Sequence, residues 1–401
     1  MPRQVRRAVL VSYAAFVLVG VSAGVTGVLL PAQMASYGVD GATIGITFFT
    51  GSAGFFLAGL NTGSLISRLG MRGTLAAGGG ACALTGLYVA SRPPFAAFLL
   101  ASLVAGYGSG VLESGLNVYL AGLPGATTLI NRLHAFFGVG ALLGPLFAAW
   151  VLGFTAWTVV WLVLALASAV LTAVFLLAFP PEPPAPDSEP PAPDSEPPPP
   201  DSKETAGDPT SAALRDRGVQ LGSVMLAVYV GVELSVGNWG FSYLVQARAL
   251  PESLAGYTVS GYWLGLTLGR FLISPLATRI GATTAAMMYA CLAGVTAAVT
   301  LAWLLPAAPS CVALALLGFF LGPVFPTTMS VASRLTRPRL VPAAIGIMNA
   351  ASTVGGSVLP WLAGTLAQSA GMRVLLPFVL ALALAQFAAW RPVAVRLRAQ
   401  G

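Results

Sequence analysis

Long apolar stretches, broken by short polar segments, run along the whole chain. Twelve of them can each cross a hydrocarbon core about 30 Å thick, for which roughly 20 helical residues suffice. We expect membrane helices over residues 8–36, 41–67, 74–91, 95–121, 128–152 and 156–179, then over 220–247, 254–278, 282–305, 309–333, 342–368 and 373–391. The pattern therefore predicts an all-α membrane protein with twelve transmembrane helices.

A proline-rich segment separates the sixth stretch from the seventh. Residues 182–202 are three copies of a heptad, EPPAPDS, EPPAPDS and EPPPPDS, which has no apolar face to bury. Such composition is typical of an extended, disordered linker. We expect a six-helix bundle over 1–179, a disordered linker over 180–219 and a second six-helix bundle over 220–401. A plain spacer is the preferred reading of the linker, and a proline-rich docking ligand is the alternative.

The two halves repeat each other in the spacing of their glycines and prolines. Gly106 and Gly110 in the fourth stretch correspond to Gly318 and Gly322, which have the same spacing in the tenth. In the same way, the fifth and eleventh stretches share a Gly-x₄-Pro spacing, which begins at Gly140 and at Gly355. Two pseudo-symmetric bundles around a midplane cavity are the architecture that secondary transporters use for alternating access.

Composition and charge support this class and set its orientation. The chain is 56% hydrophobic and only 8% charged, as in a polytopic membrane protein, and its net charge of +7 is spread between apolar stretches, so that nucleic acid is not an expected partner. Sixteen basic residues fall on the side of the termini: Arg3, Arg6, Arg7, Arg68, Arg72, Arg132, Lys203, Arg215, Arg217, Arg279, Arg334, Arg337, Arg339, Arg391, Arg396 and Arg398. Three fall on the other side: Arg92, Arg248 and Arg373. We therefore expect a multi-pass protein of the cell membrane with both termini and the linker in the cytoplasm.

Glu113 and Glu233 are the two acids inside predicted membrane helices. A charge at mid-bilayer costs roughly 3 kcal/mol on insertion scales, so such residues usually face a wet cavity and mark an ion or substrate path. Because burial favours the neutral form of a carboxylic acid, each is a candidate proton carrier. The alternative is a hydrogen-bonded glutamate that only holds helices together.

Glu113 shares a helical stripe with Gly106, Gly110 and Asn117, so this stripe should face away from lipid. Arg270 is the one basic residue deep within a predicted span, about nine residues before the cytoplasmic end of the stretch 254–278, at a depth that matches Glu113. We expect either an ion pair between these two across the cavity or an Arg270 that reaches to the inner membrane surface. Glu233 has no evident cationic partner in the sequence, which predicts that it is the more readily protonated acid.

Several motifs resemble those of the major facilitator superfamily. GSLISRLGMR at Gly63–Arg72 resembles its signature between helices 2 and 3, with Ser67 at the acidic position, and GALLGP at residues 140–145 resembles its helix 5 motif. Within the superfamily, ESGLN at 113–117, INRLHAFFGVGA at 130–141 and GPVFPT at 322–327 are similar to the fucose permease and sugar:proton symporter group. The resemblance implies proton-coupled uptake of a sugar-like neutral solute. The first helix lacks the acid that sugar symporters of this group carry there, so proton-coupled efflux of a drug or metabolite is the alternative.

Candidate site residues follow from these assignments. Amide, hydroxyl, aromatic and guanidinium side chains suit a polar solute, and the candidates for substrate binding are Asn117, Tyr229, Asn238, Trp239, Tyr262, Arg270 and Asn349. Residues near the inner helix ends are candidates for gating, and these are Arg68, Arg72, Asn131, His134 and Arg279. Arg68 and Arg72 are expected to bond helix-terminal carbonyls. For His134, a satisfied polar contact and a proton relay both remain open.

Other classes of function lack their signatures. The three cysteines lie in apolar stretches and there is a single histidine, so neither a disulfide framework nor a multi-histidine metal site is expected. No nucleophile–base constellation and no P-loop is present. We expect no enzyme activity and no cofactor. The expected partners of this monomeric chain are a small solute, protons and the lipid bilayer.

The linker assignment can be tested by replacement. If residues 182–202 are only a spacer, exchanging them for a Gly/Ser segment of equal length should leave transport unchanged, because such a segment keeps the reach of the chain. Uptake into cells, normalised to the amount of inserted protein, measures this. Loss of uptake would show a specific role for the heptads.

Overall fold

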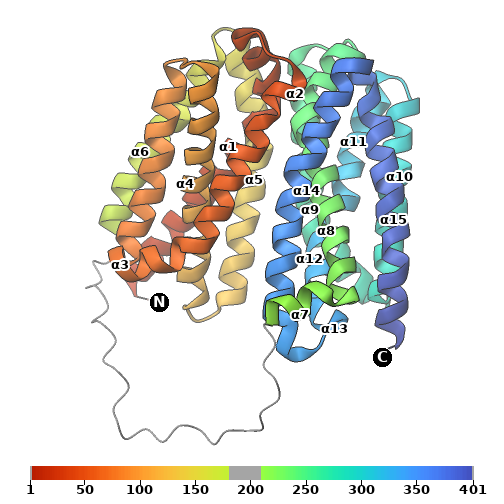
Figure 1. Cartoon of the computed structure of the whole chain (residues 1–401). Helices are drawn as coiled ribbons and strands as arrows, with labels where there is room; N and C mark the ends of the chain where they lie inside the picture. Colours follow the sequence, from red (N-terminus) through yellow and green to blue (C-terminus); the bar gives the residue numbers. More distant parts are fainter. Residues whose placement is uncertain (1, 180–208, 400–401) are drawn as a thin grey trace, which may run out of the picture.

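Two helical bundles stand side by side, one from each half of the chain (Figure 1). The computed structural model describes residues 2–179 and 209–399. The first bundle consists of α1 (Arg3–Tyr37), α2 (Gly41–Ile44), α3 (Ile46–Ala90), α4 (Phe95–Ala121), α5 (Ala126–Leu152) and α6 (Trp157–Ala178). The predicted span at residues 95–121 has the bounds of α4, and the other spans of this half lie within the observed helices or close to their ends.

The second bundle begins earlier than expected. Its helices are α7 (Pro209–Arg215), α8 (Arg217–Ser242), η1 (Tyr243–Ala247), α9 (Glu252–Arg279), α10 (Thr284–Leu304), α11 (Ala307–Leu321), α12 (Val324–Ser330), α13 (Ala332–Leu335), η2 (Pro338–Leu340), α14 (Val341–Ala370), η3 (Met372–Val374) and α15 (Leu375–Ala399). Residues 209–219 were expected to be part of the disordered linker, but 209–215 and 217–219 are helical instead. The side chain of Asp216 accepts hydrogen bonds from the N–H groups of Gly218 and Val219 and so starts α8 before the apolar stretch begins. The repeats at 182–202 lie outside the described residues.

The described residues form twelve membrane-crossing segments, the number that the sequence predicted. Ten helices of the described chain are long and apolar enough to span a membrane. One of them, α3, contains two crossings, because Gly70 adopts φ 68° and ψ 170° and turns the chain back. Consequently, Gly51 and Gly78 both contact the same part of α4, at Gly106 and Gly108. The twelfth crossing is α9, whose charged and small polar residues make it less apolar than the others.

Paired glycines have equivalent positions in the two bundles. Gly106 of α4 packs against Gly51, and Gly318 of α11 packs against Tyr262 of α9. Likewise, Gly140 of α5 contacts the backbone of α1, and Gly355 of α14 contacts the backbone of α8. A side chain at any of these positions would meet backbone atoms of the neighbouring helix. These contacts confirm the pseudo-symmetry expected from the sequence and let helices approach closely without a hydrophobic driving force.

The bundles are joined at the end opposite the two chain termini, which lie at the bottom of Figure 1. There the indole N–H of Trp361 donates to the carbonyl oxygen of Ala42 at 3.1 Å, and Gln368 Nε2 donates to Asp40 Oδ2 at 2.6 Å. Gly41 and Gly364 bring α2 and α14 into backbone contact at the same level. We call this set of contacts the far-end closure.

Removing one hydrogen bond of the far-end closure should open this end. In a protein without native cysteines, Gln368→Ala should raise the reactivity of an introduced Ala42→Cys towards an impermeant maleimide a few-fold, because a hydrogen bond contributes about 1 kcal/mol. Gln246→Ala is the matched control, since Gln246 is exposed on the same bundle. Equal labelling in all three proteins would contradict a role for this bond.

The same labelling assay tests how the far-end closure depends on pH. Hydrogen bonds from the Thr43 N–H and from Gln368 hold the pKa of Asp40 below its usual range. A lowered pKa means that the contribution of the carboxylate is present at neutral pH and is lost only as the pH falls through that lowered value. Because maleimide reacts with the thiolate, labelling is compared at each pH with that of a fully exposed cysteine in the same protein. This ratio should be the same at about pH 5.5 and pH 7.5, and a rise in the ratio at the lower pH would contradict this assignment.

Candidate functional site

A cavity of about 540 Å³ lies between the bundles. Its walls come from α4 and α5 of the first bundle and from α8, α9 and α12 of the second. The residues that line it are Glu113, Asn131, His134, Phe137, Val230, Glu233, Thr267, Arg270, Phe271, Phe325 and Pro326. Asn131 and His134 lie in the first turns of α5, towards the end that holds the termini. We call this space the central cavity.

An ion pair lies on the second-bundle side of the central cavity. Arg270 Nη2 of α9 is 3.3 Å from Glu233 Oε1 of α8, with 30% and 11% of the two side chains exposed. The same nitrogen is 3.4 Å from the hydroxyl oxygen of Tyr229, to which it donates. Arg270 Nε is buried and has no hydrogen-bond partner among the described residues, so one donor of the guanidinium remains unused. The pair places a donor and an acceptor at the cavity with no net charge.

This geometry corrects two expectations. Arg270 was expected to pair with Glu113 or to reach to the membrane surface, and it pairs with Glu233. Glu233 was expected to lack a cation and has one. The physical reason is that α8 and α9 belong to one bundle and are in contact, whereas Glu113 stands across the cavity.

Of the two acids within the membrane helices, Glu113 is the one that forms no ion pair with any described residue. It is partly buried and lines both the central cavity and a second cavity inside the first bundle. Asn117, one turn further along α4, donates from Nδ2 to the backbone carbonyl of Glu113 at 2.9 Å and does not line the central cavity. The stripe on α4 does face the protein, since Gly106 and Gly110 pack against α3.

The remaining candidates for substrate binding divide into two groups. Tyr229 and Tyr262 belong to the ion-pair cluster, because the Tyr262 hydroxyl donates to the backbone carbonyl of Glu233 at 3.1 Å. Trp239, Asn238 and Asn349 do not line the central cavity. Trp239 is fully buried and its indole N–H donates to the carbonyl oxygen of Pro360 at 2.8 Å, which gives it a packing role in this conformation.

The candidates for gating are more exposed. Asn131 and His134 line the central cavity, and the His134 ring packs edge-on against Phe16 with the ring centroids 5.5 Å apart. Within the described residues, Arg68, Arg72 and Arg279 form no hydrogen bond or ion pair, so the expected bonds to helix-terminal carbonyls are not made in this conformation. Ser67, at the acidic position of the motif, donates to its own helix at the carbonyl of Ser64. It therefore offers the arginines no counter-charge.

Sequence reasoning missed the apolar and hydroxyl residues of the cavity. Phe137, Phe271 and Phe325 line it, together with Thr267. Thr267 lies three residues before Arg270 on α9, so helical spacing from a charged residue could have indicated it. Phe325 belongs to the GPVFPT motif, but nothing in the motif itself separates an aromatic ring at a cavity from one facing lipid.

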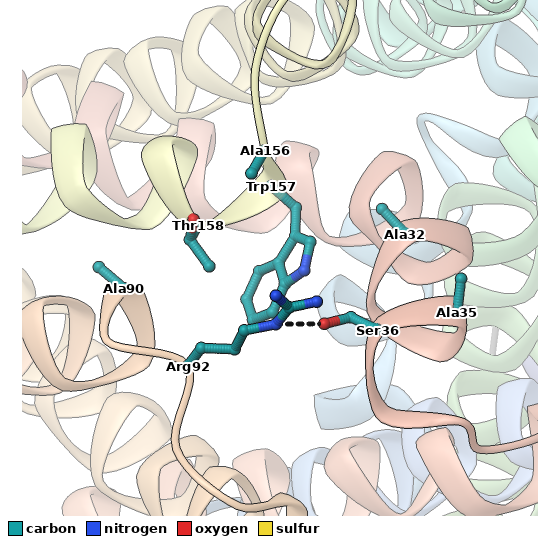
Figure 2. A pocket seen from close by; sticks show the side chains of 8 residues that line it. All are labelled: Ala32, Ala35, Ser36, Ala90, Arg92, Ala156, Trp157 and Thr158. Carbon is teal, nitrogen blue, oxygen red and sulfur yellow. Dashed lines mark hydrogen bonds between the residues drawn. The ribbon is translucent and has the colours of Figure 1, made fainter.

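A third pocket lies at the far end of the first bundle. It has a volume of about 440 Å³ and is lined by residues of α1, α3 and α6 and of the loops that flank them. Figure 2 shows Arg92, whose Nε donates to Ser36 Oγ at 2.7 Å, beside the ring of Trp157. This pocket shares no lining residue with the central cavity, so it is not part of the candidate site.

Two six-helix bundles with a polar cavity between them define a membrane transporter of the alternating-access type. The particular family follows from two overlapping matches, over residues 13–307 and 221–400, which show that the chain belongs to the Major Facilitator Superfamily. The resemblance drawn from the motifs and the twelve-helix fold are thereby confirmed.

Relatives extend along most of the chain. Bypass of stop codon protein 6 of Saccharomyces cerevisiae is 26% identical over 381 residues, which cover 89% of this chain and 76% of that protein. The glucose/galactose transporter of Brucella abortus is 27% identical over 356 residues, which cover 81% of this chain and 79% of that protein.

Solved structures share the fold. A bacterial homologue of the human lysosomal transporter Spinster, in an inward-facing and unoccupied conformation, superposes with a TM-score of 0.74 at 12% identity over 99% of this chain and 97% of that chain. The E. coli fucose:proton symporter superposes with a TM-score of 0.60 at 18% identity over 99% and 98%.

The ion pair predicts a coupling between its two residues. Glu233→Gln and Arg270→Gln should each lower the melting temperature of the detergent-purified protein, because each leaves a partly buried charge unpaired. The cost is about 3 kcal/mol, at the low end for a buried pair, because 30% of the Arg270 side chain is exposed. The double variant should recover part of the loss. Arg279→Gln is the control, because Arg279 is exposed. Strictly additive effects would show that the two side chains do not interact.

Proposed function

We propose that this transporter takes up a small, neutral, sugar-like solute together with protons, by alternating access across the cell membrane. The observation that carries this proposal is the distribution of charge around the central cavity. The second bundle contributes a mutually neutralised pair, Arg270 and Glu233, while the first contributes one unpaired acid, Glu113. An ion pair with no net charge suits an uncharged solute. A single acid that can be protonated suits transport that is coupled to protons.

The conformation is best described as inward-facing. The bias of basic residues places the end with the termini in the cytoplasm. The two hydrogen bonds of the far-end closure lie at the other end, and Asn131 and His134 line the cavity towards the cytoplasm. A solute would therefore enter or leave the central cavity from the inside in this state.

The cavity offers the groups that a polyhydroxylated solute needs. Asn131 and His134 provide neutral donors and acceptors, and the hydroxyl of Thr267, which donates to the Trp263 carbonyl, provides a further acceptor. The rings of Phe137, Phe271 and Phe325 supply apolar surface for the C–H faces of a sugar ring. Support also comes from the relatives, since one is named a glucose/galactose transporter and one similar fold belongs to a fucose:proton symporter.

Glu113 is the proposed proton carrier. An isolated carboxylate at this depth is costly when ionised, and protonation removes that cost. Glu233 has Arg270 as its counter-charge and is better suited to hold the guanidinium in place. The sequence made both acids candidate proton carriers and predicted that Glu233 is the more readily protonated, whereas the pairing of Glu233 with Arg270 supports Glu113 for this role.

Efflux of a drug or metabolite is the second candidate. The observation that favours it is the mostly apolar second cavity beside Glu113, which also suits a hydrophobic cation. Inhibition of transport by tetraphenylphosphonium, with no effect of glucose, galactose or fucose, would favour this candidate over sugar uptake.

The two glutamates should differ in transport assays. In proteoliposomes, Glu113→Gln should abolish accumulation driven by a proton gradient while solute counterflow persists, because glutamine imitates the protonated acid but cannot release a proton. Glu233→Gln should reduce counterflow and accumulation together, since it releases Arg270 from its partner.

Glu252→Gln serves as the matched control, because Glu252 is an exposed acid at the start of α9. It should behave as the unaltered protein in both assays. If Glu113→Gln retains full gradient-driven accumulation, Glu113 is not the proton carrier.

A further inference from the structure

A second cavity, of about 360 Å³, lies inside the first bundle between α1, α3, α4 and α6. We call it the N-bundle chamber. Glu113 and Phe137 line both the chamber and the central cavity, so the two spaces adjoin at these side chains. Nothing in the proposed handling of a sugar-like head group requires a chamber of this size.

The walls of the chamber are mostly apolar. They include the side chains of Leu18, Phe55, Leu112, Leu164 and Leu171. The hydroxyls of Thr26 and Ser109 also line it, but each donates to a carbonyl of its own helix, at 3.2 and 2.9 Å respectively. Apolar cavities of this kind hold water poorly and accept apolar ligands instead.

A buried indole N–H of the chamber has no hydrogen-bond partner among the described residues. Trp161 lines the chamber, and its indole nitrogen is buried without a hydrogen bond in the part of the chain that the structure describes. Buried N–H groups without partners are rare in proteins, and such a group marks a place for an acceptor from a ligand or water. The chamber therefore combines mostly apolar walls, the hydroxyls of Ser22 and Ser168, the free indole N–H of Trp161 and an acid at its boundary.

We propose that the N-bundle chamber binds the apolar portion of an amphipathic solute whose hydroxylated head lies in the central cavity. A glycoside with an aryl or alkyl group is the simplest member of this class. The inference rests on the proposed function, because it takes the head group to be sugar-like. The volumes of about 360 and 540 Å³ each fall within the range of roughly 300–1,000 Å³ of small-molecule sites. Glu113, at the boundary, is then placed to bond the oxygen that joins the two portions.

The test compares D-glucose with phenyl β-D-glucopyranoside, by titration of the purified transporter. The glucoside should bind about tenfold more tightly, because the ring is removed from water in the chamber. Ala105→Leu on α4 fills part of the chamber and should abolish this advantage without changing the affinity for glucose. Ala96→Leu, an exposed position on the same helix, is the control and should retain the advantage.

Ala23→Leu on α1 is a second variant that fills the chamber, for use if Ala105→Leu does not fold. Unchanged binding of glucose shows that a variant is folded. The inference is overturned if the glucoside binds no more tightly than glucose, or if its advantage survives both filling variants. If neither compound binds while tetraphenylphosphonium does, the sugar-like function itself fails, and the inference fails with it.

Discussion

The ion pair between Arg270 and Glu233 determines how charge is distributed in this transporter. A guanidinium within a membrane bundle needs a counter-charge, and it finds one on a helix of its own bundle. Had Arg270 paired with Glu113 across the cavity, each opening of the bundles would break a partly buried pair, at a cost of several kcal/mol. Because both partners belong to the second bundle, the pair can persist whichever side is open, and Glu113 is left without a counter-charge, as its proposed role of proton carrier requires.

Close packing within each bundle complements this arrangement. Gly106 and Gly318 bring helix backbones together at equivalent places, so that a change within a bundle would disturb many contacts at once. Between the bundles, the far-end closure relies on a few hydrogen bonds and on the contact of Gly41 with Gly364. The least costly movement is therefore one of whole bundles against each other, which is the movement that alternating access requires.

The sequence could predict the spans, the two halves and the position of Glu113 at a cavity, because each depends on local hydropathy or on a charge that lipid does not tolerate. It could not predict the partner of Arg270. Counting residues from a helix end gives the depth of a side chain in the membrane, but it does not give the direction in which the side chain points around the bundle. For the same reason the sequence made Trp239 a candidate for substrate binding, whereas its indole N–H donates to the carbonyl oxygen of Pro360. The N-bundle chamber depends on the joint packing of four helices, which no single stretch of sequence specifies.

The two ends of the molecule differ in how firmly they can close. At the far end, Asp40 accepts from Gln368 and Trp361 donates to Ala42, so closure is supported by bonds between the bundles. At the other end, Ser67 replaces the acid of the motif and bonds its own helix, and Arg68 is left without a counter-charge there. A closure that is stronger at the far end than at the end with the termini favours the state in which the central cavity opens towards the termini. In the proposed proton-coupled uptake, solute is then released readily on that side, and protonation of Glu113 acts on the return to the opposite state.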